Sequence, residues 1–317
     1  MYKKAKAAWS FIRETFTEFF DDHPLDHAAI IAFYTIFSLP AVLTITVHMA
    51  GLAFGQEQVK NEIQNRVSSI IGQESALQIQ RIVEQAGQTG DSTIGTIVGI
   101  GLMAFSATTV FVALQDALNA MWEVEARPKK GWLKVIINRL LSLAMVASMG
   151  FLLLVSLTAD LFVSLFNDYL QENFSGISAQ LISAGEFVIT TVLSMLIFGL
   201  IFKVLPDAKI RWKNTWIGAL VTALLFNLGK FLISLMLENN PLSDTYGTAG
   251  ALVMILIWVF YSSVIFLFGA EFTQVYTRHY DQGIRPSEHA VKVETKKVQM
   301  DQDGTTNEVK GKKAKKF

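Results

Sequence analysis

Six long apolar segments run through this 317-residue sequence, and they constrain its fold more than any other feature. A helix that crosses the roughly 30 Å hydrocarbon layer of a membrane needs about 20 mostly apolar residues. The segments of this length are residues 28–54, 93–118, 140–166, 181–204, 216–237 and 249–276. We therefore expect an all-α fold, a polytopic membrane helical bundle with six transmembrane helices and flanking amphipathic helices.

The composition agrees with a membrane protein. Hydrophobic residues make up 51% of the chain and charged residues only 17%, which is too few charges for an average soluble domain. The absence of cysteine excludes disulfides, zinc–thiolate sites and thiol nucleophiles. Because 27 basic residues balance 27 acidic ones, no global charge attracts nucleic acid, and we expect no nucleic-acid partner.

The basic residues are distributed unevenly between the connecting loops. Lysine and arginine cluster before the first segment, between segments two and three, between four and five, and after the sixth. Loops 167–180 and 238–248 contain neither residue, and loop 55–92 carries three basic residues among four glutamates and an aspartate. Since cytoplasmic loops are enriched in lysine and arginine, both termini are predicted to be cytoplasmic.

The sequence divides into three regions. We expect residues 1–27 to form a cytoplasmic or interfacial amphipathic helix, because Trp9 and Phe16 lie on one helical face and Glu14 on the other. This helix either lies along the inner leaflet or packs on the protein's own cytoplasmic face. Residues 28–280 form the six-span membrane domain, and residues 281–317 are predicted to be a disordered lysine-rich cytoplasmic tail.

The first outer loop, residues 55–92, has apolar residues at helical spacing from Val59 onward. We predict one or two outer helices here, broken near Gly72, whose apolar side covers the mouth of the bundle.

Polar and ionisable side chains inside the apolar segments are costly, and each is a candidate functional residue. They form helical stripes in the outer half of segments three, four and five, because residues three or four apart share one helix face. The candidate substrate-binding residues are Lys230, Glu186, Asp160, Asn227, Ser234 and Thr190. They either line an outer-facing polar cavity for an anionic headgroup, or form a structural ion pair, Lys230 with Glu186 or Asp160, among packing hydroxyls.

Two further carboxylates, Asp116 and Glu271, lie near the inner ends of segments two and six. The sequence leaves two roles open for these inner-side polar residues: structural pairing with nearby arginines such as Arg127, Arg139 or Arg278, or coupling to an ion.

Four groups of short motifs, in a fixed order, span the whole membrane domain. They are AAIIAFY at 28–34 with FSLP at 37–40, LNAMW at 118–122, LP at 205–206 with GAL at 218–220, and YGTAGAL at 246–252 with GAE at 269–271. Together they resemble the YihY/BrkB family of bacterial inner-membrane proteins. The resemblance implies a multi-pass protein of the bacterial cytoplasmic (inner) membrane. Some members carry a virulence factor label, and the family was once labelled ribonuclease BN.

A hydrolytic metal site needs clustered ligands, and the five histidines show no such spacing on one helix. We therefore expect no enzymatic activity, no catalytic residues, no metal and no cofactor. The expected function is transport or binding of an amphiphilic or anionic small molecule or lipid through the outer-facing polar cavity, with membrane lipids as partners. The alternative is a non-catalytic membrane scaffold for envelope proteins. Substrate and oligomeric state do not follow from the sequence.

Overall fold

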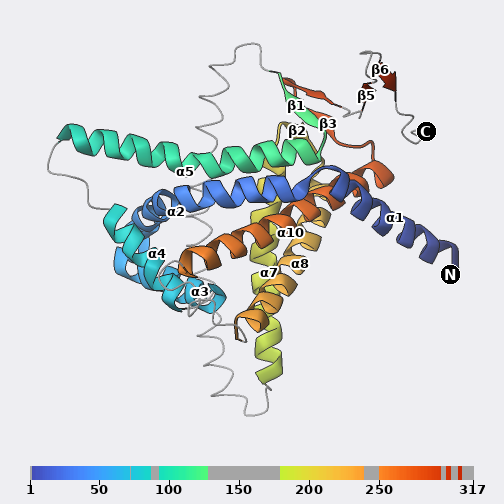
Figure 1. The fold of residues 1–317 in the computed structure, drawn as a ribbon. Coiled ribbons are helices and arrows are strands. Elements are labelled where there is room, and N and C mark those ends of the chain that lie inside the picture. Colours follow the sequence, from blue (N-terminus) through green and yellow to red (C-terminus); the bar gives the residue numbers. More distant parts are fainter. Residues whose placement is uncertain are drawn as a thin grey trace.

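The computed structural model describes residues 2–71, 73–86, 93–127, 179–238, 250–293, 298–300 and 306–308. This part of the chain forms eight helices and six short strands (Figure 1). The helices are α1 (Tyr2–Asp21), α2 (Pro24–Phe54), α3 (Gln56–Ile71), α4 (Gln73–Ala86), α5 (Thr93–Met121), α7 (Ala179–Val204), α8 (Trp212–Glu238) and α10 (Gly250–Tyr280). The strands are β1 (Val124–Ala126), β2 (Ala208–Lys209), β3 (Arg285–Pro286), β4 (Ala290–Lys292), β5 (Val298–Met300) and β6 (Thr306–Glu308).

Five of the six predicted apolar segments are helices: α2, α5, α7, α8 and α10. Within the described residues, four stretches are long and apolar enough to cross a membrane, namely Pro24–His48, Phe187–Val204, Trp212–Ile233 and Leu252–Tyr280. The chain is therefore an α-helical, multi-pass membrane protein. The third predicted segment, residues 140–166, lies outside the described residues.

The long helices pack as a bundle. α2 runs along α5 and also contacts α10, and α8 lies between α7 and α10 (Figure 1). A continuous apolar core joins them, with Phe111, Phe202 and Leu267 fully buried. Helix α2 begins at Pro24, four residues before the predicted boundary, because the fixed φ of proline suits the first helical turn.

Helices α8 and α10 approach closely through two glycine–threonine pairs. A Cβ atom built on Gly218 of α8 would lie 1.8 Å from Thr273 Oγ1 of α10, and one built on Gly269 of α10 would lie 1.9 Å from Thr222 Oγ1 of α8. Each threonine hydroxyl also donates to the glycine carbonyl four residues earlier in its own helix. The crossing therefore repeats one arrangement twice, and it depends on residues without a side chain.

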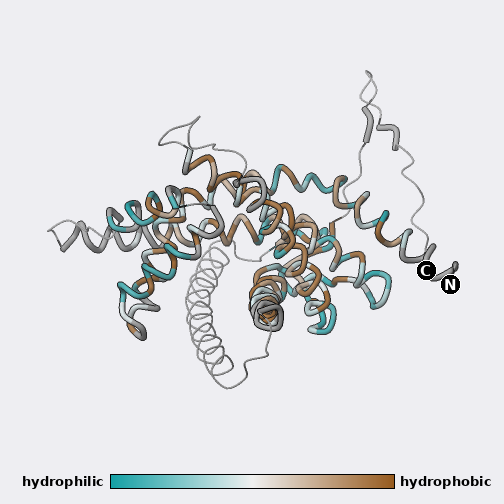
Figure 2. The backbone as a smooth tube through the Cα atoms, turned by 90° about the horizontal axis from the view of Figure 1, so that it is seen from below, coloured by the Kyte–Doolittle hydropathy of each residue, from teal (hydrophilic) through white to brown (hydrophobic). Residues whose placement is uncertain are grey.

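The amphipathic helix α1 packs against α10. Its Phe11 ring lies 5.3 Å from that of Phe272, and its Phe19 ring lies 5.3 Å from that of Phe268. Other apolar residues of α1 remain exposed, including Trp9 and Phe20, and hydrophobic and hydrophilic residues alternate along this helix in Figure 2. Of the two interpretations of this segment, the structure shows packing on the protein itself, and the exposed aromatic residues leave a membrane contact as an expectation.

Two helices, α3 and α4, occupy the segment that the sequence analysis assigns to the first outer loop, and both contact α2. They lie at one end of the bundle, whereas β1, β2 and β3 lie at the opposite end (Figure 1).

The prediction that the chain is disordered from residue 281 onward is wrong for residues 281–293. Strand β3 pairs with β2, and β4 pairs with β1, both antiparallel. Ile284 is buried in the main apolar core, and the Ser287 amide donates to the Asp207 carbonyl at 2.9 Å. Composition did not reveal that residues 281–293 are ordered against the bundle, because this attachment depends on one buried isoleucine and a few backbone hydrogen bonds.

Candidate functional site

A cavity of about 360 Å³ lies among the five long helices of the bundle. Sites for small molecules typically measure about 300–1,000 Å³ and have mostly apolar walls. The lining residues are Ile31, Thr35, Ser38, Leu39 and Val42 of α2; Val110, Phe111 and Leu114 of α5; Ser194, Ile197, Phe198 and Ile201 of α7; Phe226 of α8; and Trp258, Val259, Ser262, Ser263 and Phe266 of α10. No charged side chain is among them.

Apart from the indole nitrogen of Trp258, the polar side-chain atoms of this cavity are hydroxyls, and three of these hydroxyls are already used by their own helices. Thr35 donates to the Ile31 carbonyl at 2.7 Å, Ser263 donates to the Val259 carbonyl at 2.7 Å, and Ser38 donates to the Tyr34 carbonyl. Such back-bonding satisfies a hydroxyl in an apolar environment. The walls therefore suit a hydrocarbon chain better than a charged group.

Ser262 differs from these three hydroxyls. Its Oγ is buried and has no hydrogen-bond partner among the described residues. A buried hydroxyl without a partner costs free energy, so a polar atom of a bound molecule that reached this position would be favoured.

Five of the eight residues singled out in the sequence have side chains that the structure describes, and none of these five lines the cavity. Asn227 is buried and donates from Nδ2 to Thr191 Oγ1 at 2.9 Å, joining α8 to α7. The sequence analysis selected Thr190, which is exposed, instead of its neighbour Thr191. Thr191 lies on the face of α7 that meets α8, and Thr190 does not. The polar residues of α7 alone do not indicate which of its faces meets α8.

Lys230 follows Asn227 by about one turn of α8, and its Nζ lies 5.9 Å from the ring centroid of Phe226, a residue of the cavity wall. Helices α7 and α8 are antiparallel neighbours, so Glu186 lies ~7.5 Å and Lys230 ~4.5 Å from the Thr191–Asn227 contact, toward the same end. The two positions are therefore close in depth. The side chains of Glu186 and Ser234 and the whole of Asp160 lie outside the described residues, so the outer site stays a prediction.

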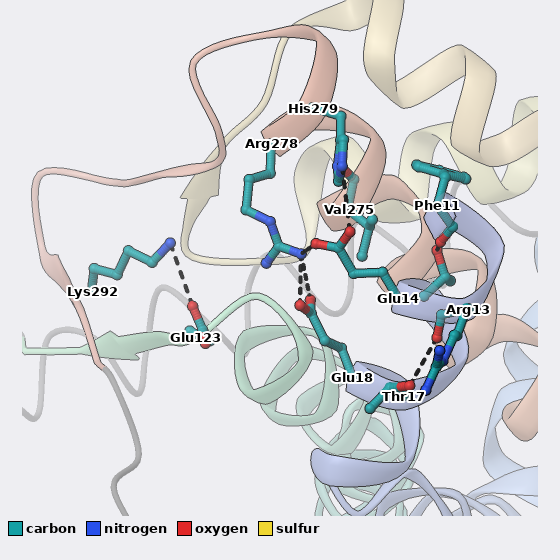
Figure 3. A network of polar contacts seen from close by, with 11 residues as sticks. Phe11, Arg13, Glu14, Thr17, Glu18, Glu123, Val275, Arg278, His279 and Lys292 are labelled. Atoms are coloured by element: carbon teal, nitrogen blue, oxygen red, sulfur yellow. Dashed lines mark hydrogen bonds and ion pairs between the residues drawn. The ribbon is translucent and has the colours of Figure 1, made fainter. Parts of the chain in front are cut away.

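The two carboxylates predicted to lie on the inner side, Asp116 and Glu271, differ in their exposure to solvent. Asp116 is exposed on α5, whereas Glu271 is fully buried, with 0% of its surface accessible. Arg278 does not hydrogen-bond to Glu271. Its Nη2 instead lies 2.7 Å from carboxylate oxygens of both Glu14 and Glu18 of α1 (Figure 3). Burial raises the pKa of Glu18, and this hydrogen bond from Arg278 partly offsets the effect.

A second polar joint at this end was missed from the sequence. Asp207, in the turn between α7 and α8, accepts from Asn119 Nδ2 at 2.9 Å and from Gln115 Nε2 at 3.1 Å, while its own amide donates to Asn119 Oδ1. Nearby, the indole of Trp122 donates to the Ala270 carbonyl at 3.0 Å. The LNAMW and GAE motifs and the aspartate that follows the LP motif, far apart in the sequence, therefore supply contacts that hold one end of the bundle together.

Metal ligation has no support in the described residues, since no three His, Asp or Glu side chains there are close enough to hold an ion.

The profile of the family described as virulence factor BrkB matches residues 15–294 of the chain. This range begins within α1 and ends just after β4, so it includes every helix that lines the cavity.

Several curated membrane proteins are similar to the chain. A UPF0761 membrane protein of Psychrobacter sp. is 25% identical over 287 residues, which is 86% of this chain and 51% of the relative. Another, from Alkalilimnicola ehrlichii, is 26% identical over 80% of this chain and 55% of the relative. A third, from Aeromonas salmonicida, is 24% identical over 83% of this chain and 87% of the relative. The chain spans about half the length of the first two. No solved structure matches it.

Proposed function

The chain belongs to the virulence factor BrkB family of membrane proteins, and from that premise we propose that it binds an amphiphilic, lipid-like molecule and moves it within the membrane. The observation that carries the proposal is the cavity of about 360 Å³, whose walls are apolar and aromatic with a few hydroxyls. A hydrocarbon chain gains free energy from such walls, and an ion does not. This role requires no bond-making chemistry, so we propose that the chain is not an enzyme.

The position of Lys230 is an argument that this molecule has an anionic headgroup. It is one turn from Phe226, so a molecule with its chain against the Phe226 wall could extend its headgroup toward the ammonium. The sequence analysis placed the ligand in an outer-facing polar cavity. Here its apolar part lies in the cavity between the long helices, and Lys230 remains the contact for the headgroup.

Filling the cavity tests the proposal. Ser262→Phe places an aromatic ring in the space that the ligand would occupy, and we expect native mass spectrometry of the detergent-purified protein to show about tenfold less retained lipid, a loss of ~1.4 kcal/mol in binding free energy. The matched control is Ile257→Phe on the same helix, whose position is exposed. It should retain lipid like the wild type.

Two results would contradict the proposal. One is a wild-type protein that retains no lipid in the gentlest detergent although it is folded, which would favour the scaffold alternative. The other is equal lipid retention in the wild type, Ser262→Phe and Ile257→Phe.

We also propose six spans, with residues 140–166 as the third, in the bacterial inner membrane with both termini cytoplasmic. Reporter domains fused after Lys134 and Lys213 should then report the cytoplasm, and fusions at Gln171 and Ser243 should report the outer side, because basic loops stay inside. Paired alkaline phosphatase and fluorescent protein fusions measure this directly. A cytoplasmic signal at Gln171 would exclude the six-span arrangement.

A further inference from the structure

Glu271 is a carboxyl group in the core of the bundle to which no described donor group hydrogen-bonds. It lies on α10 directly after Gly269 and Ala270, and it is fully buried. Neither of its carboxyl oxygens has a hydrogen-bond partner that donates to it among the described residues. Leaving a charged carboxylate in such a place is costly, so this side chain needs either a cation or a proton.

The group that faces Glu271 is a second carboxyl. Asp22, at the end of α1, lies within hydrogen-bonding reach of Glu271. Two ionised carboxylates have only acceptor oxygens, so they form a hydrogen bond only when one of them carries a proton. Two carboxylates sharing one site cannot both ionise easily.

Among the described residues, the surroundings of Glu271 and Asp22 do not supply enough positive charge to hold both groups ionised. Arg278 of α10, the basic group that acts on Glu271, is engaged by Glu14 and Glu18. Lys292 of β4 is paired with Glu123 at 3.4 Å (Figure 3). The charged groups that act on Glu271 and Asp22 are Glu18 and Asp21 of α1, Glu123 in the turn before β1, and Arg278 of α10.

We propose that Glu271 and Asp22 form a proton-binding site that holds one proton between the two carboxyl groups and thereby ties the end of α1 to α10. This inference does not depend on lipid binding. When the proton leaves, two carboxylates oppose each other at the α1–α10 contact, and the end of α1 is repelled from the inner end of the bundle.

The direction of the pH dependence follows from Asp22. Burial, followed by repulsion from Glu123 and Glu18, raises the pKa of Asp22 from 3.8 to about 7. Between these two values the folded protein holds a proton that the unfolded chain has lost, so the folded state binds more protons. Stability from this site is therefore fully present at acidic pH and is lost as the pH rises toward 7.

Infrared spectroscopy of the full chain in lipid nanodiscs tests the proposal. We expect the wild type to show the C=O band of a protonated carboxyl, shifted in heavy water, that disappears as the pH is raised between about pH 5 and pH 9. Glu271→Gln and Asp22→Asn should each remove this titrating band. The control Asp26→Asn changes an exposed aspartate in the first turn of α2 and should keep it.

The variants also have a stability readout. The melting temperature of the wild type should fall as the pH rises from about 4 to about 7, and the slope should flatten in Glu271→Gln and in Asp22→Asn but not in Asp26→Asn. If Glu271→Gln fails to fold, Asp22→Asn and the wild-type titration still decide the question. A wild type without a titrating protonated carboxyl, or a band that survives in Asp22→Asn and Glu271→Gln alike, would overturn the proposal. So would a band that disappears at fixed pH on addition of sodium, since the ligand would then be a metal cation.

Discussion

Replacing Gly269 with alanine is expected to lower the free energy of unfolding by about 1–3 kcal/mol or more, because it overpacks the crossing of α8 and α10. The new Cβ would lie 1.9 Å from Thr222 Oγ1 and 2.8 Å from Thr222 Cβ. The clash involves a branched side chain close to its own backbone, so no rotamer change relieves it, and the two helices must separate. Unfolding by a denaturing detergent in mixed micelles measures the loss.

The same crossing provides a rescue and a control. Adding Thr222→Ala to Gly269→Ala removes the hydroxyl and the methyl group but not the Cβ of residue 222, so part of the stability should return and the two effects should not add. Gly185→Ala in α7 introduces a Cβ with no atom within 4 Å, and it should leave stability equal or slightly higher because alanine favours helix. Equal stability of Gly269→Ala and Gly185→Ala would contradict the close crossing.

Trp122→Ala should have a larger effect, with a loss of about 3–5 kcal/mol that is typical for a large aromatic residue removed from a core. Trp122 is 1% exposed, its ring lies 6.2 Å from that of Phe202, and its indole donates to the Ala270 carbonyl. The substitution therefore leaves a cavity and removes a hydrogen bond between the end of α5 and α10. The free energy of unfolding of the purified protein is the measurement.

Two substitutions separate these contributions of Trp122. Trp122→Phe keeps most of the packing and loses the hydrogen bond, so its cost should be about 0.5–1.5 kcal/mol plus a smaller cavity. Trp9→Ala removes a tryptophan that is 69% exposed on α1, and its cost should be much smaller. A Trp122→Ala protein as stable as Trp9→Ala would show that the joint at the end of α5 contributes little to the fold.

The helices of this protein could be predicted from the sequence because each long apolar run has only one stable backbone conformation in a membrane. Hydropathy therefore located α2, α5, α7, α8 and α10, and helical periodicity located α1, α3 and α4. These signals are local, and each depends on residues within one or two turns.

The contacts between helices could not be predicted in the same way. Asn119 and Asp207 are 88 positions apart in the sequence and meet only because α5 and the α7–α8 turn end at the same level. Thr191 contacts α8 while Thr190 is exposed, and this difference depends on the rotation of α7 about its axis. The cavity likewise arises where five helices fail to fill the space between them, so no single helix carries its pattern.

For the charged residues, the sequence predicted an important position but not the contacts around it. Glu271 was selected from the sequence because an ionisable residue inside an apolar segment is costly, and the structure places it in the core. Of its expected arginine partners, Arg278 pairs with Glu14 and Glu18 and Arg127 pairs with Glu125, whereas Arg139 lies outside the described residues. The sequence analysis left open whether α1 packs on the protein, and its packing on α10 decides which carboxylates share the arginine.

The central claim, that the cavity holds the chain of an amphiphilic molecule, is tested most directly by photo-crosslinking. A photoreactive amino acid in place of Ser262 lines the cavity, and one in place of Ile257 lies on the exposed side of the same helix. After extraction and washing in gentle detergent, bulk lipid is removed, so irradiation should give a lipid adduct at position 262 and none at position 257. A position-262 adduct only with residues 140–166 of the same chain, or no lipid adduct there at all, would contradict the account.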